Sequence, residues 1–537
     1  MSTLPILAPS DIVPAHPSPR NPGKAKHVTL IRPAMVSSTG TWSSPITPPL
    51  GIAYLAAMLE ENGTKVAVID AIAEGVEQFI ESDGYVFQGL TTEQTVARID
   101  GETDMIGISI MFTQDWPCLL ELIRAIRKRF PETMIVAGGE HITALPEFSL
   151  ENCPELDVCA LGEGEETIVD LVNHVDSGGS LHDVAGIAFR EGGKVVRTVV
   201  RKRIRDVDAL PIPSWDLFPM DVYMDSRNAH GVYLGKSIGI LATRGCPYKC
   251  TFCSNPVMYG NLWMARSPSL VLDEIELYIK KYGIRNVDFY DLTFILKKSW
   301  IIEFCRLIEE RGLQFTWQLP TGTRSEVIDD EVSAALYRTG CRNITYAPES
   351  GSPDTLERIK KRVHLPKLVD SIRSALRQKI NVKCNIVIGF PHETRQHVLQ
   401  TIVFCWKLAV IGVQDVGMFI FSPYAGSQLF DELRKDGTIG PLNDDYFRSL
   451  VAFMDPLAPS LYCKHINGRE LALWRFFGMS SFFLLSYMIR PWRLVRMIRN
   501  VIRNESVTVL EQRLGAILRR HAVRAPATSE ARTPAAV

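Results

Sequence analysis

Apolar residues in the first half of the chain follow two alternating patterns. Short continuous apolar runs predict strands, and longer stretches with one apolar face predict helices. Strands are predicted at 27–33, 65–70, 105–110, 133–139 and 156–162, and helices between them at 50–63, 116–130 and 165–175. Because strands and helices alternate, we expect an α/β fold with a parallel sheet covered on both faces. This predicts a doubly wound, Rossmann-like domain over 27–180.

A second alternation follows a charged, proline-punctuated stretch that we expect to be a linker over 181–235. Helical patterns, such as 269–283, separate its apolar strands. The six predicted strands are 237–243, 286–290, 314–319, 343–348, 383–390 and 416–422. Six strand–helix units of this kind predict a partial TIM-like (β/α)6 barrel over 236–436, with its chemistry at the carboxyl ends of the strands.

The two ends of the chain lack this alternation. Residues 1–26 and 523–537 predict a disordered leader and a disordered tail, and 437–522 predicts a mostly helical region. Within it, 475–503 combines a short apolar helix, expected to be too brief to cross a bilayer, with a helix that carries an arginine every three or four residues. This second helix could lie in a membrane interface, or dock its apolar face on the barrel and leave its arginines solvated.

Composition narrows the class of protein. Hydrophobic residues make up 46% and charged residues 22%, which is typical of a soluble globular protein. The formal net charge of −1 gives no basic field for nucleic acid. The amino terminus lacks the features of a signal peptide, and the eleven cysteines are an odd number. We therefore expect a cytoplasmic protein, with any membrane contact through 475–503 peripheral to the inner face.

Three cysteines are close together directly after the first predicted barrel strand. Cys246, Cys250 and Cys253 lie within eight residues, whereas the other eight cysteines are scattered among apolar neighbours. A disulfide needs two thiols and a closed structural zinc site needs four ligands. A four-iron cluster held by three thiolates would keep one iron free for an outside ligand. Zinc, with a fourth ligand from Cys341 or a distant histidine, remains the alternative.

The segment CPYKCTFC resembles the Cys-x3-Cys-x2-Cys signature of radical S-adenosylmethionine enzymes. Later segments resemble further motifs of that family, namely FYDLTF (289–294), APESGS (347–352), IGFPHET (388–394) and FSPYAGSQL (421–429). With a doubly wound domain ahead of the barrel, the arrangement over about 27–436 resembles the cobalamin-dependent branch. The resemblance implies three cofactors: a [4Fe–4S] cluster, S-adenosylmethionine and cobalamin.

The resemblance also implies site residues in the barrel. The three cysteines would ligate the cluster, and its open iron would chelate the amino and carboxylate groups of S-adenosylmethionine. Asp291 is all that remains of a usual acidic pair and could equally be a helix cap or a surface acid; Arg324 could equally be a solvated loop residue. The residues expected to contact S-adenosylmethionine are Phe252, Asp291, Arg324, Glu349, Ser350 and Gly389.

Cobalamin is expected at the carboxyl ends of the strands of the first domain, where glycines let a flat ligand approach the backbone. The Asp-x-His-x-x-Gly motif of other corrinoid proteins is absent, so the lower face of cobalt has no assigned ligand, and His141 is the only substitute considered. The residues expected to contact cobalamin are Pro49, Gly51, Ser109, Gly138, Gly139, His141, Gly162, Glu163 and Gly164.

Three functions remain open. The resemblance favours a radical C-methyltransferase that acts on an unactivated carbon of a small-molecule or lipid-like substrate, with an external electron donor such as flavodoxin or ferredoxin. A radical cyclase or rearrangement enzyme of the same architecture is the first alternative. A non-catalytic corrinoid or metal carrier is the second, although a carrier has no use for the 347–352 and 388–394 segments. No catalytic residue is assigned.

Overall fold

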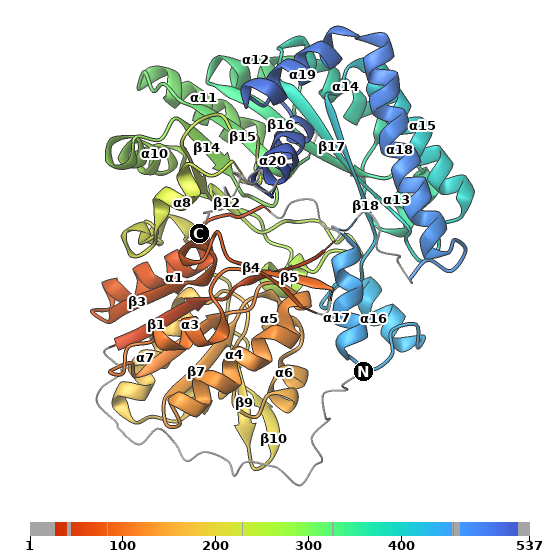
Figure 1. Cartoon of the computed structure of the whole chain (residues 1–537). Coiled ribbons are helices and arrows are strands. Elements are labelled where there is room, and N and C mark those ends of the chain that lie inside the picture. The colour runs from red at the N-terminus through yellow and green to blue at the C-terminus, as the bar shows by residue number, and fades with distance from the viewer. Residues whose placement is uncertain are drawn as a thin grey trace, which may run out of the picture.

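The computed structural model describes residues 27–39, 45–82, 84–227, 229–324, 327–453, 455 and 462–524. The leader predicted for 1–26 lies outside these residues, as does the tail predicted for 523–537 except for its first two residues. The chain forms two lobes, with the first domain below and the barrel above in Figure 1.

The lower lobe is the expected doubly wound domain. Its seven-stranded sheet has the order β10-β9-β8-β7-β6-β1-β3. The parallel strands are β1 (His27–Arg32), β3 (Lys65–Asp70), β6 (Met105–Ser109), β7 (Met134–Gly138) and β8 (Val158–Ala160). Helices α1 (Leu50–Glu61) and α7 (Glu165–Ser177) contribute to one core and α4 (Trp116–Arg129) to the other. The order reverses at β1, which places a ligand crevice at the carboxyl ends of β1 and its neighbours.

The sheet continues into the range expected to be a linker. Strands β9 (Ile187–Glu191) and β10 (Lys194–Arg197) add an antiparallel hairpin to β8. The hairpin turns at Gly192 and Gly193, which have φ values of +55° and +77°, the paired left-handed conformation that a two-glycine turn allows. A small antiparallel sheet of β2 (Met35–Ser38), β4 (Phe79–Ser82) and β5 (Tyr85–Gln88) was also not expected, because such four-residue strands carry little periodicity.

The upper lobe is the expected partial barrel. Its six strands are parallel and lie in chain order: β11 (Ser237–Ile240), β14 (Asn286–Phe289), β15 (Thr316–Thr323), β16 (Cys341–Glu349), β17 (Asn381–Ile388) and β18 (Asp415–Ile420). The helices that connect them are α10 (Pro268–Tyr282), α11 (Lys298–Glu310), α12 (Asp330–Arg338), α13 (Pro353–Arg358), α14 (Leu365–Arg377) and α15 (Arg395–Ile411). A short ribbon of β12 (Thr243–Arg244) and β13 (Met264–Ala265) flanks the cysteine loop.

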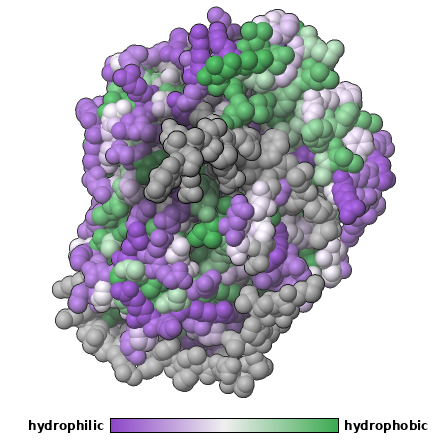
Figure 2. All heavy atoms as spheres, in the orientation of Figure 1, coloured by the Kyte–Doolittle hydropathy of each residue, from purple (hydrophilic) through white to green (hydrophobic). Residues whose placement is uncertain are grey.

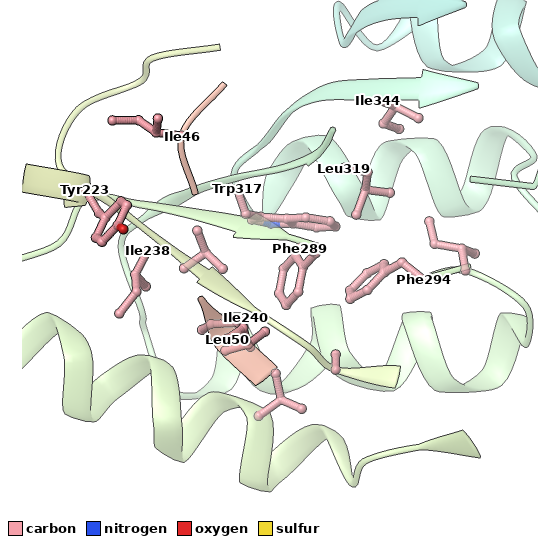
Figure 3. Packing of buried hydrophobic residues seen from close by; sticks show 14 of the residues in the cluster. Ile46, Leu50, Tyr223, Ile238, Ile240, Phe289, Phe294, Trp317, Leu319 and Ile344 are labelled. Atoms are coloured by element: carbon pink, nitrogen blue, oxygen red, sulfur yellow. The ribbon is translucent and has the colours of Figure 1, made fainter. Parts of the chain in front are cut away.

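Both hydrophobic core clusters contain residues of the two lobes. Phe289, Phe294 and Trp317 pack together inside the barrel, with ring centroids 4.3 Å apart for the two phenylalanines. Figure 3 shows Leu50 of the first domain beside Ile240 of β11. Because these clusters support both domains, the carboxyl ends of the two sheets are held in a fixed relation.

The carboxyl-terminal region is helical, as expected, but differs in detail. Its helices are α16 (Gln428–Lys435), α17 (Asp444–Leu450), α18 (Gly468–Ile489), α19 (Trp492–Arg503) and α20 (Val509–Arg524). Among the described residues, α18 is the one helix long and apolar enough to cross a membrane by length and composition, so the expectation that it is too brief was wrong. It packs against α15 and β18.

The expectation of solvated arginines on α19 is wrong for Arg493, which is buried.

The remaining helices are short. Most of them connect strands of the first domain or flank the cysteine loop. They are α2 (Ala71–Glu74), α3 (Thr92–Ala97), α5 (Glu140–Ala144), α6 (Pro146–Asn152), α8 (Met220–Met224) and α9 (Asn255–Tyr259).

Candidate active site between the two domains

The cysteine loop follows β12 at the carboxyl edge of the barrel. Cys246, Cys250 and Cys253 are free and half-buried, whereas six of the other eight cysteines are fully buried. The loop turns at Gly245, where φ is +79° and an added Cβ would lie 2.1 Å from the Leu262 carbonyl oxygen, so no other residue fits. The backbone of the loop is thus closely fixed at Gly245, and its three cysteines are only partly buried.

The three thiols suit a cluster better than a single ion. No three His, Cys, Asp or Glu side chains of the described residues converge as one ion requires. Cys341, weighed as a fourth zinc ligand, begins β16 and therefore lies at the amino end of the barrel strands, away from the loop. Three thiolates on one loop are the donor set that a four-iron cluster takes, with one iron left for another ligand.

Asp291 anchors the turn that leads into the cysteine loop. Its carboxylate accepts hydrogen bonds from the Thr243 backbone amide and hydroxyl, at 2.5 and 2.6 Å, and from the Ala242 amide at 3.3 Å. Burial raises the pKa of this carboxyl to about 7. Asp291 is therefore neither a helix cap nor a surface acid, and its oxygens are already engaged by the protein.

Arg324, predicted to contact S-adenosylmethionine, lies buried beside the cysteine loop. Its guanidinium stacks 3.7 Å from the ring centre of Tyr248 and donates to the carbonyl oxygens of Lys361 and Arg362, each at 2.9 Å. It thereby joins the cysteine loop to the 361–362 loop and is not a solvated loop residue.

A buried ion pair lies at the end of β16. Glu349 has φ of +66°, a strained conformation for a residue with a side chain, and its Oε1 accepts from Lys361 Nζ at 2.8 Å. Both side chains are about one-tenth exposed. The charge of Lys361 also acts on the Cys250 thiol, whose pKa is raised by burial and lowered in part by this lysine. Lys361 was missed because it lies in a basic loop outside any recognised motif.

Ser350 and Gly389 shape the neighbouring turns. The Ser350 hydroxyl is fully buried, lies 2.9 Å from Thr401 Oγ1 and accepts from the Ser352 amide, so it organises the turn after β16. Gly389 has φ of +87° and its amide donates to Glu393 Oε2 at 2.7 Å. Glu393, the acid of the 388–394 segment, was not assigned a role from the sequence.

Phe252 closes the site beside Gly389. Its ring lies 5.6 Å from that of Phe390, which directly follows the glycine. The aromatic residue of the cysteine signature and the turn after the fifth barrel strand therefore lie side by side.

The glycines predicted to contact cobalamin lie at the carboxyl ends of β6, β7 and β8. Ser109, Gly138 and Gly139 end or follow two of these strands, and Gly162 and Gly164 follow the third. This edge faces the cysteine loop, because Ser254 Oγ donates to Glu140 Oε1 across the two domains. Pro49 caps the start of α1, and the space around Gly51 is open.

Two of the predicted cobalamin residues point elsewhere. His141 is fully buried, with its ring 4.7 Å from that of Trp116, and burial lowers its pKa to about 3. Glu163 accepts from Arg203 Nε at 2.7 Å and pairs with Arg244 at 3.4 Å. A contact of either side chain with cobalamin therefore has no support in the geometry.

Arg244 extends this network into the cysteine loop. It directly precedes Gly245, and its guanidinium lies 2.6 Å from Glu165 Oε1 of the first domain. It also lies over the Tyr54 ring of α1, 4.8 Å from the centroid. All these groups are buried, so the network fixes the cysteine loop against the first domain.

Two further sets of residues were not predicted to matter. Met111 and Phe112, which follow β6 after Ile110, are exposed apolar side chains at the edge where the strand order reverses. Polar residues line the barrel interior, including Asn343, Lys383 and Asn385, and the buried Asn343 Nδ2 and Asn385 Oδ1 have no hydrogen-bond partner among the described residues. The strand predictions at 343–348 and 383–390 contained these polar positions, but only the barrel shows that they face the same interior.

Comparisons with known proteins agree with this geometry. The family described as B12 binding domain matches residues 42–172, and the radical SAM superfamily matches residues 240–405. An uncharacterized methyltransferase of Pyrococcus horikoshii is 32% identical over 412 residues, which cover 76% of this chain and 83% of the relative. The chain belongs to the cobalamin-binding radical S-adenosylmethionine enzymes. Its cofactors are those of the family: a [4Fe–4S] cluster, S-adenosylmethionine and cobalamin.

Other relatives of this enzyme differ in the reactions that they are named for. Cytidylyl-2-hydroxyethylphosphonate methyltransferase of Streptomyces wedmorensis is 28% identical over 429 residues, covering 74% of this chain and 79% of the relative. Anaerobic magnesium-protoporphyrin IX monomethyl ester cyclase of Cereibacter sphaeroides is 26% identical over 403 residues, covering 74% and 61%.

Solved structures share the fold at lower identity. The cobalamin-dependent radical enzyme OxsB with aqua-cobalamin bound aligns with a TM-score of 0.67 and 17% identity, over 93% of this chain and 76% of that chain. The methyltransferase TsrM from Kitasatospora setae, with cobalamin and a [4Fe–4S] cluster, aligns with a TM-score of 0.60 and 17% identity, over 77% and 75%.

Proposed function

We propose that this enzyme transfers a methyl group to an unactivated carbon of a small-molecule substrate. The proposal rests on one observation: the carboxyl edge of the barrel faces that of the first domain. The Ser254–Glu140 and Arg244–Glu165 contacts hold the two edges together. This arrangement places a methyl carrier opposite the radical-generating loop, with a substrate between them. Relatives named as methyltransferases support the same reaction.

Different residues of the chain would hold different cofactors. Cys246, Cys250 and Cys253 would hold the cluster. Glu349 and Lys361 form a pair of opposite charges that matches the amino and carboxylate groups of S-adenosylmethionine, so we assign both to that end of the molecule. When bound, the cluster supplies the electron that cleaves S-adenosylmethionine, and cobalamin supplies the methyl group.

Supporting residues hold this arrangement in place. Asp291, Arg324 and Ser350 fix the surrounding loops through the hydrogen bonds described above. Phe252 and Gly389 would flank the adenosyl group. The glycine-rich edge with Met111 and Phe112 would receive the corrin ring.

A cavity lined by His230, Gln318, Asn343, Lys383 and Asp415, among others, lies at the amino ends of the barrel strands. It is on the far side of the barrel from the cysteine loop, so the substrate class is not inferred from it. That the enzyme is cytoplasmic and that it takes its electron from an external donor remain predictions.

A radical cyclase is the second candidate, because three magnesium-protoporphyrin cyclases are among the relatives. One experiment separates the two. Anaerobically reconstituted enzyme is incubated with cobalamin, a low-potential reductant, methyl-deuterated S-adenosylmethionine and a small-molecule extract. A product that gains the labelled methyl group supports the methyltransferase. A product that loses hydrogen without gaining the label supports the cyclase.

A further inference from the structure

Helices α18 and α19 expose many apolar side chains and also bury polar ones. The buried positions of α18 recur every three or four residues and include Arg475 and Ser486 besides Leu471 and Phe482. On the opposite side, Phe476 of α18 is 71% exposed, and Trp492 and Ile502 of α19 are 62% and 78% exposed. A helix that only docks on a globular core buries its apolar side chains and exposes its polar ones.

Arginines fix this orientation. Arg490 donates to the carbonyl oxygens of Ala409 and Val410, both at 3.0 Å, and Arg493 donates to those of Gly412 and Val413, at 2.7 and 2.9 Å. Ala409 and Val410 lie in the last turn of α15, and Gly412 and Val413 directly follow it, so the two arginines bind carbonyls at and just beyond the end of this helix. Rotating α19 to bury its apolar side would break the Arg493 bonds inside the protein. The exposure is therefore built into the fold.

The apolar surface continues onto α15, which packs beside α18. Val403 and Val410 of α15 are exposed on the same side of the barrel. We call the exposed apolar side chains of α15, α18 and α19 the outer face; part of it is the green area at the top and upper right of Figure 2. Soluble monomers seldom expose contiguous apolar surface that spans three helices.

The charges around the outer face are mostly positive. From Leu471 to Arg503 the chain contains six arginines and no acidic residue, and α15 contains no acidic residue. Arg499 and Arg503 of α19 and Lys407 of α15 are exposed. Glu470, at the start of α18, is paired with Arg395 at 2.6 Å. An apolar face with a basic rim complements a surface that is apolar inside and anionic outside.

We propose that the outer face docks this enzyme on an anionic lipid bilayer, with α18 and α19 lying along the membrane surface. A second copy of the chain fits less well, because a two-fold contact through this face would bring Arg499 and Arg503 of both copies together. A membrane crossing by α18 fits less well too, because Arg475 on its buried side donates to the Asp455 carbonyl oxygen at 2.9 Å.

Vesicle flotation of the full-length enzyme tests the proposal. The probes are neutral phosphatidylcholine vesicles and vesicles that also contain phosphatidylglycerol. We expect flotation with the anionic vesicles and roughly tenfold less with the neutral ones. The combined variant Trp492→Ser, Ile498→Ser, Ile502→Ser should reduce binding to anionic vesicles about tenfold or more, because it removes three inserted side chains.

A matched variant controls for general loss of apolar surface. Val199 and Val200 are 77% and 87% exposed but lie at the end of the first domain's hairpin, away from the outer face. Val199→Ser, Val200→Ser should leave flotation unchanged, and both variants should keep the unfolding midpoint of the wild type. Equal loss in both variants, or no flotation of the wild type, would overturn the proposal. So would a wild-type dimer, measured by sedimentation, that the triple variant dissociates.

Discussion

The carboxyl edge of the barrel and that of the first domain are built differently. In the barrel, buried side chains such as Asp291, Arg324 and Glu349 end the strands, and each holds a neighbouring loop. In the first domain, the edge is largely glycine backbone, and His141 and Glu163 face the interior. A small zwitterion is recognised by placed charges, whereas a large flat ring needs an open surface that the backbone can approach.

The sharpest test of the barrel edge concerns the cysteines. Cys250→Ala should reduce S-adenosylmethionine cleavage to the background of the assay, because two thiolates cannot hold the cluster. The control is Cys341→Ala, which removes a buried thiol at the amino end of β16 and should retain cleavage. Deoxyadenosine formation, measured by chromatography, decides; cleavage by the Cys250 variant would remove the basis of the radical assignment.

The second test concerns the charged pair. Lys361→Met should weaken S-adenosylmethionine binding roughly 10- to 100-fold, because a charged hydrogen bond contributes about 1.5–3 kcal/mol. Lys360→Met is the matched control, since the Lys360 ammonium lies in the same loop but bonds Gln428 at the surface. Binding is measured by isothermal titration of the reconstituted enzyme. Equal affinity in the two variants would mean that Lys361 only supports the loop.

The third test uses pH. Burial raises the pKa of the Glu393 carboxyl from its ordinary 4.5 to about 7, so the folded state keeps a proton that the unfolded state loses. This contribution to stability is complete below about pH 4.5 and is lost as pH rises to about 7, a decrease of about 3 kcal/mol.

Glu393→Gln should remove that part of the pH dependence. An amide oxygen can still accept from the Gly389 and Phe390 amides, but the group no longer titrates. The free energy of unfolding is measured by denaturant titration at both ends of the window, for wild type and variant. Parallel curves for the two proteins would show that Glu393 is already ionised when folded.

The smallest effect is expected in the first domain. His141→Phe should change cobalamin affinity less than about twofold, because the imidazole is stacked on Trp116 inside the core and not presented at the edge. Gly139→Val should instead weaken binding and folding together, since an added Cβ would lie 2.5 Å from the Ile110 carbonyl oxygen. Loss of cobalamin from the His141 variant would mean that this side chain, and not mainly the glycine backbone, binds the ring.

The sequence predicted the parallel strands and the longer helices of both domains because apolar runs and amphipathic stretches alternate cleanly there. It also located the cysteine loop and the turns at Glu349 and Gly389, since these residues lie within recognisable motifs. Lys361 could not be found, because its partner Glu349 is twelve residues away in sequence and only the folded loop brings them together. The β9–β10 hairpin had a usable signal in Gly192 and Gly193, which was overlooked.

The orientation of α19 illustrates a second limit. Its pattern of arginines and apolar residues defines two faces but does not say which one contacts the barrel. That choice depends on the carbonyl oxygens of Gly412 and Val413, about eighty residues earlier in the chain, which accept from Arg493. These long-range hydrogen bonds hold the arginine side of α19 against the barrel and leave its apolar side on the outside.

The cysteine loop and the edge of the first domain are proposed to form one site. Electron paramagnetic resonance on the anaerobically reconstituted enzyme, with and without cobalamin, tests it most directly. We expect a reduced four-iron signal that S-adenosylmethionine perturbs, together with a signal of bound cob(II)alamin. A cluster signal unaffected by S-adenosylmethionine, or bound zinc with neither signal, would contradict it.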